Sequence, residues 1–446
     1  MNRTSSPAVV KATDATAPVS ERAAAAEAQR ISAARRRYTL LLLILVYIVA
    51  MMDRSIVTVL LQPIKLEFAL NDTQLGFVSG LAFAIAFSIA ALPLGHLVDR
   101  VQRRWILAVV VVIWSGLTFS SGFATAFVVL CVARLGVGFA EAGEAPSAMS
   151  LVADLYPANK RASAVALLYL GVPIGAILGL LIAGYVVPHL GWRAALMVAG
   201  TPGILLAVVI ALTMKEPVRG SFDAAPASAA QSLSLGQGIR GLIHDPVLVH
   251  LLVGTGLLSM VASSMSVWMP TLLMRHFDLP IAHVGRLLAL STGICGIIGS
   301  VVCGPLADRL TGGKASRLAF ATAVFGLLMG LVWAACISSS DHVRALIFNG
   351  IFNALVPGYL ACVHGAVLTH VAPRTRGFTV GVVAIMTNLV GYGVGPQLVG
   401  IASDLLTARG SDAPLAGAMM LMLVPAVWGS LHYFAAARRK AAQELR

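Results

Sequence analysis

The sequence Gly95-His-Leu-Val-Asp-Arg100 recurs in related form as Gly304-Pro-Leu-Ala-Asp-Arg309 in the second half of the chain. Each copy of this Gly-x-Leu-x-Asp-Arg pattern follows the second long apolar segment of its half. A second repeated pattern, a proline followed by two basic residues, occurs in two further loops. One loop has Pro157, Lys160 and Arg161, and the other, in the second half, has Pro373, Arg374 and Arg376. Matching loops at matching positions predict that the two halves are structural repeats.

The composition of the chain is that of an integral membrane protein. Of its 446 residues, 58% are hydrophobic and 11% are charged, and the mean hydropathy is +0.87. Soluble domains usually have about a quarter of their residues charged. The apolar segments are long and contain Gly and Pro, which favours bundled helices over a membrane barrel.

We expect an all-α membrane protein of twelve transmembrane helices, each with about 20 residues to cross a hydrocarbon core roughly 30 Å thick. Residues 38–214 and 247–437 form two pseudo-symmetric halves of six helices around a central cavity. Residues 215–246 are rich in Pro, Ser and Ala and are predicted to form a cytoplasmic linker, within which residues 233–243 fit either a short interfacial helix or a loop. The remaining segments, 1–37 and 438–446, are predicted to be a flexible N-terminal tail and a C-terminal tail, both cytoplasmic.

The basic residues predict the orientation of the helices. The net charge is +13, and Lys and Arg gather in the loops that share one side when both termini are cytoplasmic. This bias follows the positive-inside rule, so we interpret it as orientation in the inner membrane and expect no nucleic-acid partner. We expect a monomer that contacts the lipid bilayer and a small-molecule substrate.

No catalytic or cofactor motif is present in the sequence. The five cysteines lie in apolar segments without paired metal-type spacing, so we expect no disulfide and no metal. The motifs of zinc hydrolases, serine hydrolases and nucleotide-binding loops are missing, and we therefore predict no enzyme, no catalytic residue and no cofactor. A proton is the expected coupling ion.

The repeated loop resembles the signature of the major facilitator superfamily over residues 38–440. Several shorter motifs resemble the bacterial spinster-like transporters, and the anion:cation symporter branch is close: Met52-Asp-Arg-Ser-Ile56, Asn71-Asp-Thr-Gln-Leu-Gly76, Arg134-x6-Glu141-Ala142 and Asp154-Leu-Tyr-Pro-Ala-Asn-Lys-Arg-Ala162. The resemblance implies transport by alternating access through a cavity between the halves. It also implies that the charged residues of the first and fourth spans bind substrate or carry protons.

Charged side chains inside the first and fourth spans are the strongest site candidates. Arg134 and Glu141 are seven residues apart, so they share one helix face about 10 Å apart along the axis. Counting residues from the ends of the spans, at 1.5 Å per residue, places Asp53, Arg54 and Arg134 at similar depths in the membrane. This depth allows either an Asp53–Arg134 pair or an Arg54–Glu141 pair. Such groups are costly in a membrane unless they function or are paired, and a purely structural ion pair is the alternative.

Different roles are expected for these charges. Arg134 or Arg54 would attract an anionic group, and Arg134 is the favoured candidate. Glu141 is the better proton carrier, because burial disfavours its charged form and nearby arginines favour it. Glu144 precedes Pro146, which must distort the helix. Glu144 is either a second cavity carboxylate or a side chain that reaches water or bonds backbone groups freed by the kink.

The resemblance implies a cytoplasmic gating network across the halves. In it, Asp99 faces a helix N-terminus of the other half and Asp154 pairs with Arg100 or Arg104. Breaking the network should favour the inward-open state. Its predicted members are Gly95, Asp99, Arg100, Arg103, Arg104, Asp154, Gly304, Asp308 and Arg309.

The second half lacks comparable buried charges, so its side of the cavity should be more apolar. Ser263, Met265, Asn353 and Asn388 are its candidate cavity residues, with interhelical hydrogen bonding as the alternative for the asparagines. Small-residue spacing predicts tight helix contacts and hinges. These hinge or packing residues are Pro146, Gly171, Pro173, Gly175, Gly391, Gly395 and Pro396.

We therefore expect a secondary active transporter that moves an amphipathic or carboxylate-bearing small-molecule anion, coupled to protons. The alternative is an uncoupled facilitator or an exporter of lysolipid- or sphingolipid-like amphiphiles. A membrane-embedded enzyme or a sensor is a third class that the absent motifs disfavour.

Overall fold

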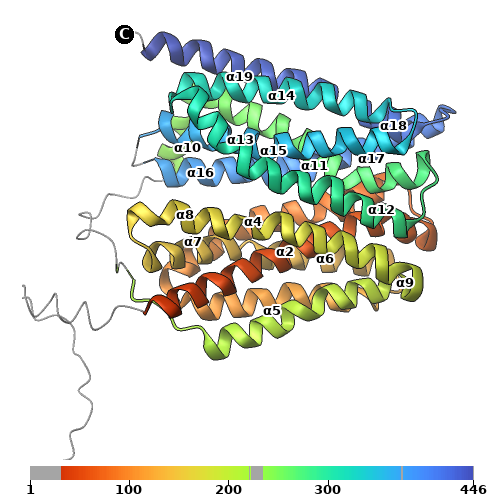
Figure 1. Cartoon of the computed structure of the whole chain (residues 1–446), viewed down its shortest axis with the longest axis horizontal. Coiled ribbons are helices and arrows are strands. Elements are labelled where there is room, and N and C mark those ends of the chain that lie inside the picture. Colours follow the sequence, from red (N-terminus) through yellow and green to blue (C-terminus); the bar gives the residue numbers. More distant parts are fainter. Residues whose placement is uncertain (1–31, 220, 222–234, 373–374, 445–446) are drawn as a thin grey trace, which may run out of the picture.

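The computed structural model describes residues 32–219, 221, 235–372 and 375–444, and within these ranges the regular elements are all helices (Figure 1). The first half contains α2 (Ala33–Phe68), α3 (Asp72–Gly76), η1 (Phe77–Leu81), α4 (Ala82–Arg100), α5 (Arg103–Ser121), α6 (Phe127–Glu141), α7 (Glu144–Leu155), α8 (Ala158–Tyr169) and α9 (Gly171–Thr213). Helix α10 (Leu235–His244) lies in the linker.

The second half repeats the pattern. It contains α11 (Pro246–His276), α12 (Ile281–Leu288), η2 (Ala289–Ile294), α13 (Cys295–Thr311), α14 (Ala315–Ile337), α15 (His342–His370), α16 (Arg376–Ile385), η3 (Met386–Val394), α17 (Gly395–Ala408), α18 (Pro414–Met420) and α19 (Leu423–Glu444). Elements η1, η2 and η3 are π-helical segments inside the second, eighth and eleventh spans.

Twelve spans account for these helices. Within the described ranges, ten stretches are long and apolar enough to cross a membrane. One of them, Ser163–Thr213, holds two spans, because Gly191 leaves the helical region with φ 77° and ψ 171°. The twelfth is the fourth span, which is split at Ala142 and Gly143 into α6 and α7. Pro146 lies in the first turn of α7, where its missing N–H is tolerated, so the helix breaks before the proline.

The terminal helices extend beyond their predicted bounds. Helix α2 begins at Ala33 rather than at residue 38, because the Ser32 side chain accepts a hydrogen bond from the Arg35 N–H and caps it. Helix α19 continues to Glu444, although 438–446 was predicted to be a tail. Its end is tied to the neighbouring span, since Glu444 accepts a 2.5 Å hydrogen bond from the Ser316 hydroxyl.

The halves meet near one end of the bundle (Figure 1). We call this the opposite end, where α2 ends at Phe68, and we call the other, where α4 ends at Arg100, the basic end. Helix α9 packs on α12, α3 on α17, and η1 on η3. A Cβ on Gly285 of α12 would lie 2.4 Å from the Leu180 carbonyl oxygen of α9, so only glycine allows this contact. At the basic end, α8 packs on α2, α7 and α9, and α16 packs on α11, α15 and η3, so their main contacts stay within one half.

The predicted hinge glycines pack inside their own halves. A Cβ on Gly175 would lie 2.3 Å from the Ile48 carbonyl oxygen of α2, and one on Gly395 would lie 2.8 Å from the Met260 carbonyl oxygen of α11. These contacts bring α9 close to α2 and η3–α17 close to α11. They hold each of these helix pairs together within its own half.

Candidate functional site

Asp53 and Arg134 form a buried ion pair between α2 and α6. Arg134 donates from Nη1 to Asp53 Oδ2 at 3.1 Å and from Nη2 to the Thr118 hydroxyl of α5 at 3.1 Å. Thr118 in turn donates to Asp53 Oδ1 at 2.5 Å. Three spans are therefore joined by one network whose charges balance.

Arg54 and Glu141 form a second ion pair next to the first. Arg54 donates from Nε to Glu141 Oε2 at 2.7 Å, and its Nη2 makes an ion-pair contact with the same oxygen at 2.6 Å. Its guanidinium also lies 4.4 Å from the Phe83 ring centroid and 5.9 Å from that of Phe87, both on α4. The aromatic faces attract the guanidinium and fix its plane.

Both pairs exist together, although depth counting treated them as competing arrangements. Neighbouring residues of a helix diverge by about 100°, so Asp53 and Arg54 point to different places along α6. Arg134 and Glu141 are two turns apart on that helix, so Arg134 meets Asp53 and Glu141 meets Arg54.

The favoured assignment of anion attraction to Arg134 does not fit this geometry. Its side chain is 7% exposed and is paired with Asp53 and Thr118, whereas the Arg54 side chain is 20% exposed. Among the described residues, Nη1 of Arg54 has no hydrogen-bond partner. Arg54 is therefore the better placed of the two arginines.

Glu144 is buried beside these pairs and begins α7. It is 7% exposed, and within the described part of the chain its Oε1 has no hydrogen-bond partner. Oε1 of Glu141 is likewise buried and unpaired. Glu144 is within electrostatic range of Arg54, Tyr47 of α2 and Tyr169 of α8. Among the described residues no backbone group donates to it at the break of the fourth span, where the Ser147 hydroxyl donates to Gly143 O.

The predicted cavity residues of the second half fall into two groups. Ser263 and Met265 are each 1% exposed, and Ser263 donates to the Gly391 carbonyl oxygen at 2.7 Å. The prediction that they line the open cavity is therefore wrong, since they face η3 and the core around α11. Asn353 and Asn388 are half-buried and bond within their own spans, Asn353 to Asn349 and Asn388 of η3 to the Ala384 carbonyl oxygen of α16.

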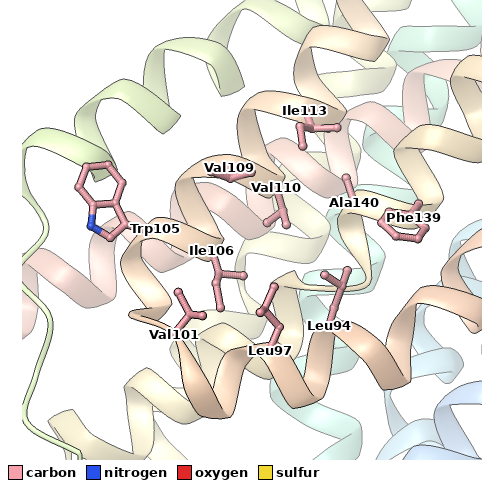
Figure 2. Close-up of a pocket in the computed structure, with 10 residues that line it drawn as sticks. All are labelled: Leu94, Leu97, Val101, Trp105, Ile106, Val109, Val110, Ile113, Phe139 and Ala140. Carbon is pink, nitrogen blue, oxygen red and sulfur yellow. The ribbon is translucent and has the colours of Figure 1, made fainter.

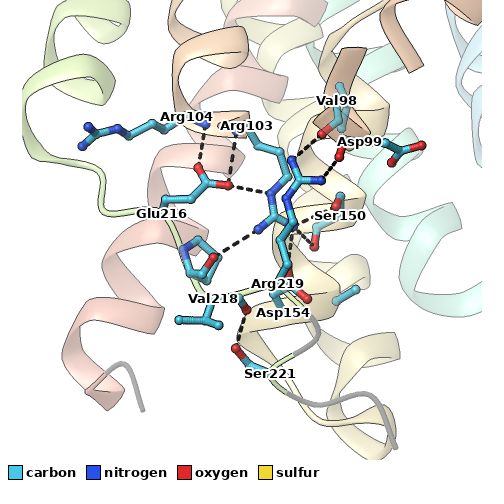
Figure 3. A network of polar contacts seen from close by, with 12 residues as sticks. Val98, Asp99, Arg103, Arg104, Ser150, Asp154, Glu216, Val218, Arg219 and Ser221 are labelled. Atoms are coloured by element: carbon cyan, nitrogen blue, oxygen red, sulfur yellow. Dashed lines mark hydrogen bonds and ion pairs between the residues drawn. The ribbon is translucent and has the colours of Figure 1, made fainter. Parts of the chain in front are cut away.

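Arg103 organises the basic end of the first half (Figure 3). It is 1% exposed, forms an ion pair with Asp154 of α7 and another with Glu216 at 2.7 Å, and donates to the Ser150 hydroxyl at 2.8 Å. The prediction that Asp154 pairs with Arg100 or Arg104 is therefore wrong. Arg103 begins α5 and reaches α7, whereas Arg104 bonds Met214 O and the Glu216 carboxylate.

Among the described side chains, no hydrogen bond or ion pair of the predicted lock joins the two halves in this state. Arg219 donates to the backbone oxygens of Val98, Asp99 and Val101, while the Asp99 carboxylate points away from the network (Figure 3). All these groups belong to the first half or to the start of the linker. The side chains of Gly304 and Asp308 lie outside the described residues, and Arg309 is exposed in the last turn of α13.

The opposite end carries the ionic contacts that join the halves, which the sequence analysis did not single out. Asp72 of α3 accepts from Lys65 at 2.6 Å and, in the second half, from Arg275 at 2.8 and 2.9 Å and from Ser403 at 2.7 Å. Asp404 of α17 accepts from the backbone N–H groups of Asp72 and Thr73. The sequence does contain a signal for these contacts. Lys65 and Arg275 are two of the few basic residues expected on that side, and Asp72 is an acidic residue at a helix start there.

An apolar pocket of about 290 Å³ lies between α4, α5 and α6 but holds none of the predicted site residues (Figure 2). Its walls are hydrocarbon and aromatic side chains: Leu94, Leu97, Val101, Trp105, Ile106, Val109, Val110, Ile113, Phe139 and Ala140. Several of these are exposed, as expected for residues that meet lipid. The charged groups of α2, α6 and α7 therefore remain the candidate site.

Comparisons with known proteins identify the family of the chain. The model of the family described as Major Facilitator Superfamily matches residues 43–396. The chain is 28% identical over 390 residues to an MFS-type efflux pump of Mycolicibacterium smegmatis, covering 87% of this chain and 89% of the pump. It is 25% identical over 372 residues to protein spinster homolog 1 of Xenopus laevis, covering 79% of this chain and 70% of that protein.

A solved structure extends the likeness to the fold. The crystal structure of a bacterial homolog of the human lysosomal transporter Spinster, in an inward-facing and unoccupied conformation, superimposes with a TM-score of 0.83 at 25% identity. The match covers 92% of this chain and 99% of the other.

Proposed function

The chain belongs to the major facilitator superfamily and is a transporter related to the spinster-like proteins, and we propose that it moves an amphipathic or carboxylate-bearing anion coupled to protons. Transport proceeds by alternating access across the inner membrane. Asp53 and Glu141 are the proton-linked carboxylates of this proposal, and Arg54 receives the anionic group.

The orientation in this proposal follows from the basic residues. Lys and Arg favour the cytoplasmic side, so the basic end is cytoplasmic and both termini lie there. Because the halves meet at the opposite end, the site opens toward the cytoplasm. The related solved structure with the TM-score of 0.83 is inward-facing, which supports this assignment.

One observation carries the coupling proposal. Arg54 meets a single oxygen of Glu141, Oε2, with one hydrogen bond and one further ion-pair contact, and within the described residues Oε1 is left buried and unpaired. A proton added at Oε1 neutralises Glu141 and converts the ion pair into weaker hydrogen bonds. Arg54 then has charge to offer an anion, so proton binding and anion binding favour one another.

Uptake into proteoliposomes tests this function. Succinate and lysophosphatidylglycerol serve as probes, with an acidic outside or equal pH on both sides. We expect the gradient to raise uptake of one probe severalfold and Glu141→Gln to abolish the response. Asp412→Asn, which removes an exposed carboxylate from the loop after α17, is the control and should retain it.

The same measurement separates the uncoupled alternative. A facilitator would equilibrate the probe equally with and without a gradient, and Glu141→Gln would leave the rate unchanged. That result would contradict proton coupling but not transport.

A further inference from the structure

We propose that the apolar pocket between α4, α5 and α6 binds one acyl chain of an anionic membrane lipid, and that Arg104 binds the headgroup of that lipid. The pocket holds none of the charged groups of the candidate site. The inference therefore goes beyond the proposed function and does not depend on it.

The pocket has a buried floor and an exposed rim. On the floor, Ile106, Val110 and Ala140 are 2–5% exposed. On the rim, Val109 and Phe139 are each 50% exposed (Figure 2). A hollow of about 290 Å³ that is lined by hydrocarbon and open at its rim admits an acyl chain, whereas a polar group would lose its hydrogen bonds there.

The break of the fourth span gives the pocket its shape. Phe139 and Ala140 lie in the last turn of α6, just before the break at Gly143. A Cβ on Gly143 would lie 3.1 Å from Val110 Cγ1 and 3.5 Å from Leu94 Cδ1, and both of these side chains line the pocket. The course of the backbone therefore shapes the hollow, rather than the rotamer of one side chain.

Arg104 places a positive charge at the basic end of the pocket. Its guanidinium lies 4.9 Å from the ring centroid of Trp105, which lines the pocket in the first turn of α5. The Arg104 side chain extends away from the Arg103 network (Figure 3) and donates to Met214 O at 3.3 Å. Among the described residues, its Nε is buried without a hydrogen-bond partner and its guanidinium forms no ion pair.

The headgroup decides which lipid is bound. Lipid tails are as apolar as the pocket, so an acyl chain gains little by leaving the bilayer for it. An anionic phosphate headgroup gives Arg104 charge-assisted hydrogen bonds, as in other basic pockets between spans. Arg100, exposed at the end of α4, adds a second positive charge, while the Asp99 carboxylate points away from Arg104 (Figure 3). An anionic lipid is therefore favoured over a zwitterionic lipid with the same chains.

Native mass spectrometry of the full-length protein in detergent tests the site. Dioleoylphosphatidylglycerol and dioleoylphosphatidylcholine are titrated separately, so that only the headgroup differs. We expect the first phosphatidylglycerol to bind about fivefold more tightly than the first phosphatidylcholine. Arg104→Gln should remove most of this preference. Arg317→Gln, the same change at an exposed position in the first turn of α14, should keep it.

Val109→Trp tests the acyl position without altering a charge. The larger side chain would fill the pocket from its rim, so the first lipid of either kind should bind roughly threefold or more weakly, because its chain loses contact with the floor. Val112→Trp, at an exposed position of the same helix outside the pocket lining, is the matched control and should bind both lipids like the wild type.

The proposal is overturned if the wild type binds the two lipids equally, or if Val109→Trp and Val112→Trp bind them alike. A preference lost equally in Arg104→Gln and Arg317→Gln would show general attraction to the basic end and would also reject the site. The midpoint of thermal unfolding without added lipid verifies that each variant is folded, and the Val109→Trp arm decides the matter if Arg104→Gln is not.

Discussion

The two ends of the bundle hold their ionic contacts in different ways. At the opposite end, Asp72 takes hydrogen bonds from Arg275 and Ser403 of the other half, so the contacts join the halves. At the basic end, Arg103 binds Asp154 and Glu216, so the contacts stay within the first half and the start of the linker. In the proposed alternating access the first set has to break, whereas the second set can stay intact.

This difference separates groups that set the conformation from groups that hold a half together. Substitutions at the opposite end should change which state is populated, and substitutions at Arg103 should change whether the first half folds. Four predictions follow this division, from the largest expected effect to the smallest.

Replacing Arg103 with Ala should cause the largest loss of stability. It leaves Asp154 and Glu216 without their shared cation in a place where Arg103 is 1% exposed. Removing one member of a buried ion pair costs about 3–5 kcal/mol. A lowered midpoint of thermal unfolding in detergent measures the effect.

Arg309→Ala, an exposed change at the end of α13, is the control and should unfold like the wild type. If Arg103→Ala unfolded at the wild-type temperature, the network would not be the support of the first half.

Replacing Asp72 with Asn should open the opposite end. The change removes the charge that Lys65 and Arg275 share, and hydrogen bonds to charged groups are worth about 1.5–3 kcal/mol. The population with separated halves at this end should rise about tenfold or more, since about 1.4 kcal/mol is a factor of ten. Spin labels at Leu66 and Arg409, on a background without native cysteines, report the distance between the halves.

The matched control for the charge is Asp412→Asn in the exposed loop. An unchanged distance distribution in Asp72→Asn would mean that backbone packing alone closes this end.

Gly285→Ala tests the packing part of that closure without altering a charge. The added methyl group would lie 2.4 Å from the Leu180 carbonyl oxygen, so α9 and α12 must separate. Overpacking costs typically about 1–3 kcal/mol, and here the strain falls on one state only. The same spin labels should show a smaller shift toward separation than with Asp72→Asn.

Gly296→Ala in the same span has open space around its Cβ position and should leave the distance unchanged. A shift of equal size in both variants would assign the effect to helix propensity rather than to contact between the halves.

The fold could be predicted from the repeat and from hydropathy, because twelve apolar segments and a twice-used loop restrict the architecture to a few choices. The partners within the site could be predicted only in part. Counting residues along helices gives depth, and depth brought Asp53 and Arg54 near the fourth span. Which residue meets which depends also on the rotation of each helix about its own axis. Without that information the sequence could not show that both ion pairs form together.

Other features could not be predicted for identifiable physical reasons. Helix α11 has no polar face, because it is packed by neighbours on most sides, so nothing in its sequence showed that Ser263 and Met265 are buried. Hydropathy does not indicate which conformation is adopted, because the same two halves meet whether the bundle closes at the opposite end or at the basic end. Asp72 was missed because an acidic residue in a first helical turn is ordinary helix chemistry.

Asp99→Asn is the smallest expected effect and sharpens the contrast between the ends. Its carboxylate points away from the Arg103 network. The free energy of unfolding should therefore change by about 0.5 kcal/mol or less, as for an ordinary surface substitution. If Asp99 meets a helix N-terminus of the other half when the basic end closes, the variant loses about 0.3–1 kcal/mol in that state only. The open form of the basic end should then gain up to about fivefold in population, without any change in unfolding. Spin labels across the basic end measure that gain, and a drop in unfolding temperature without it would place Asp99 with Arg103 among the groups that hold the first half together.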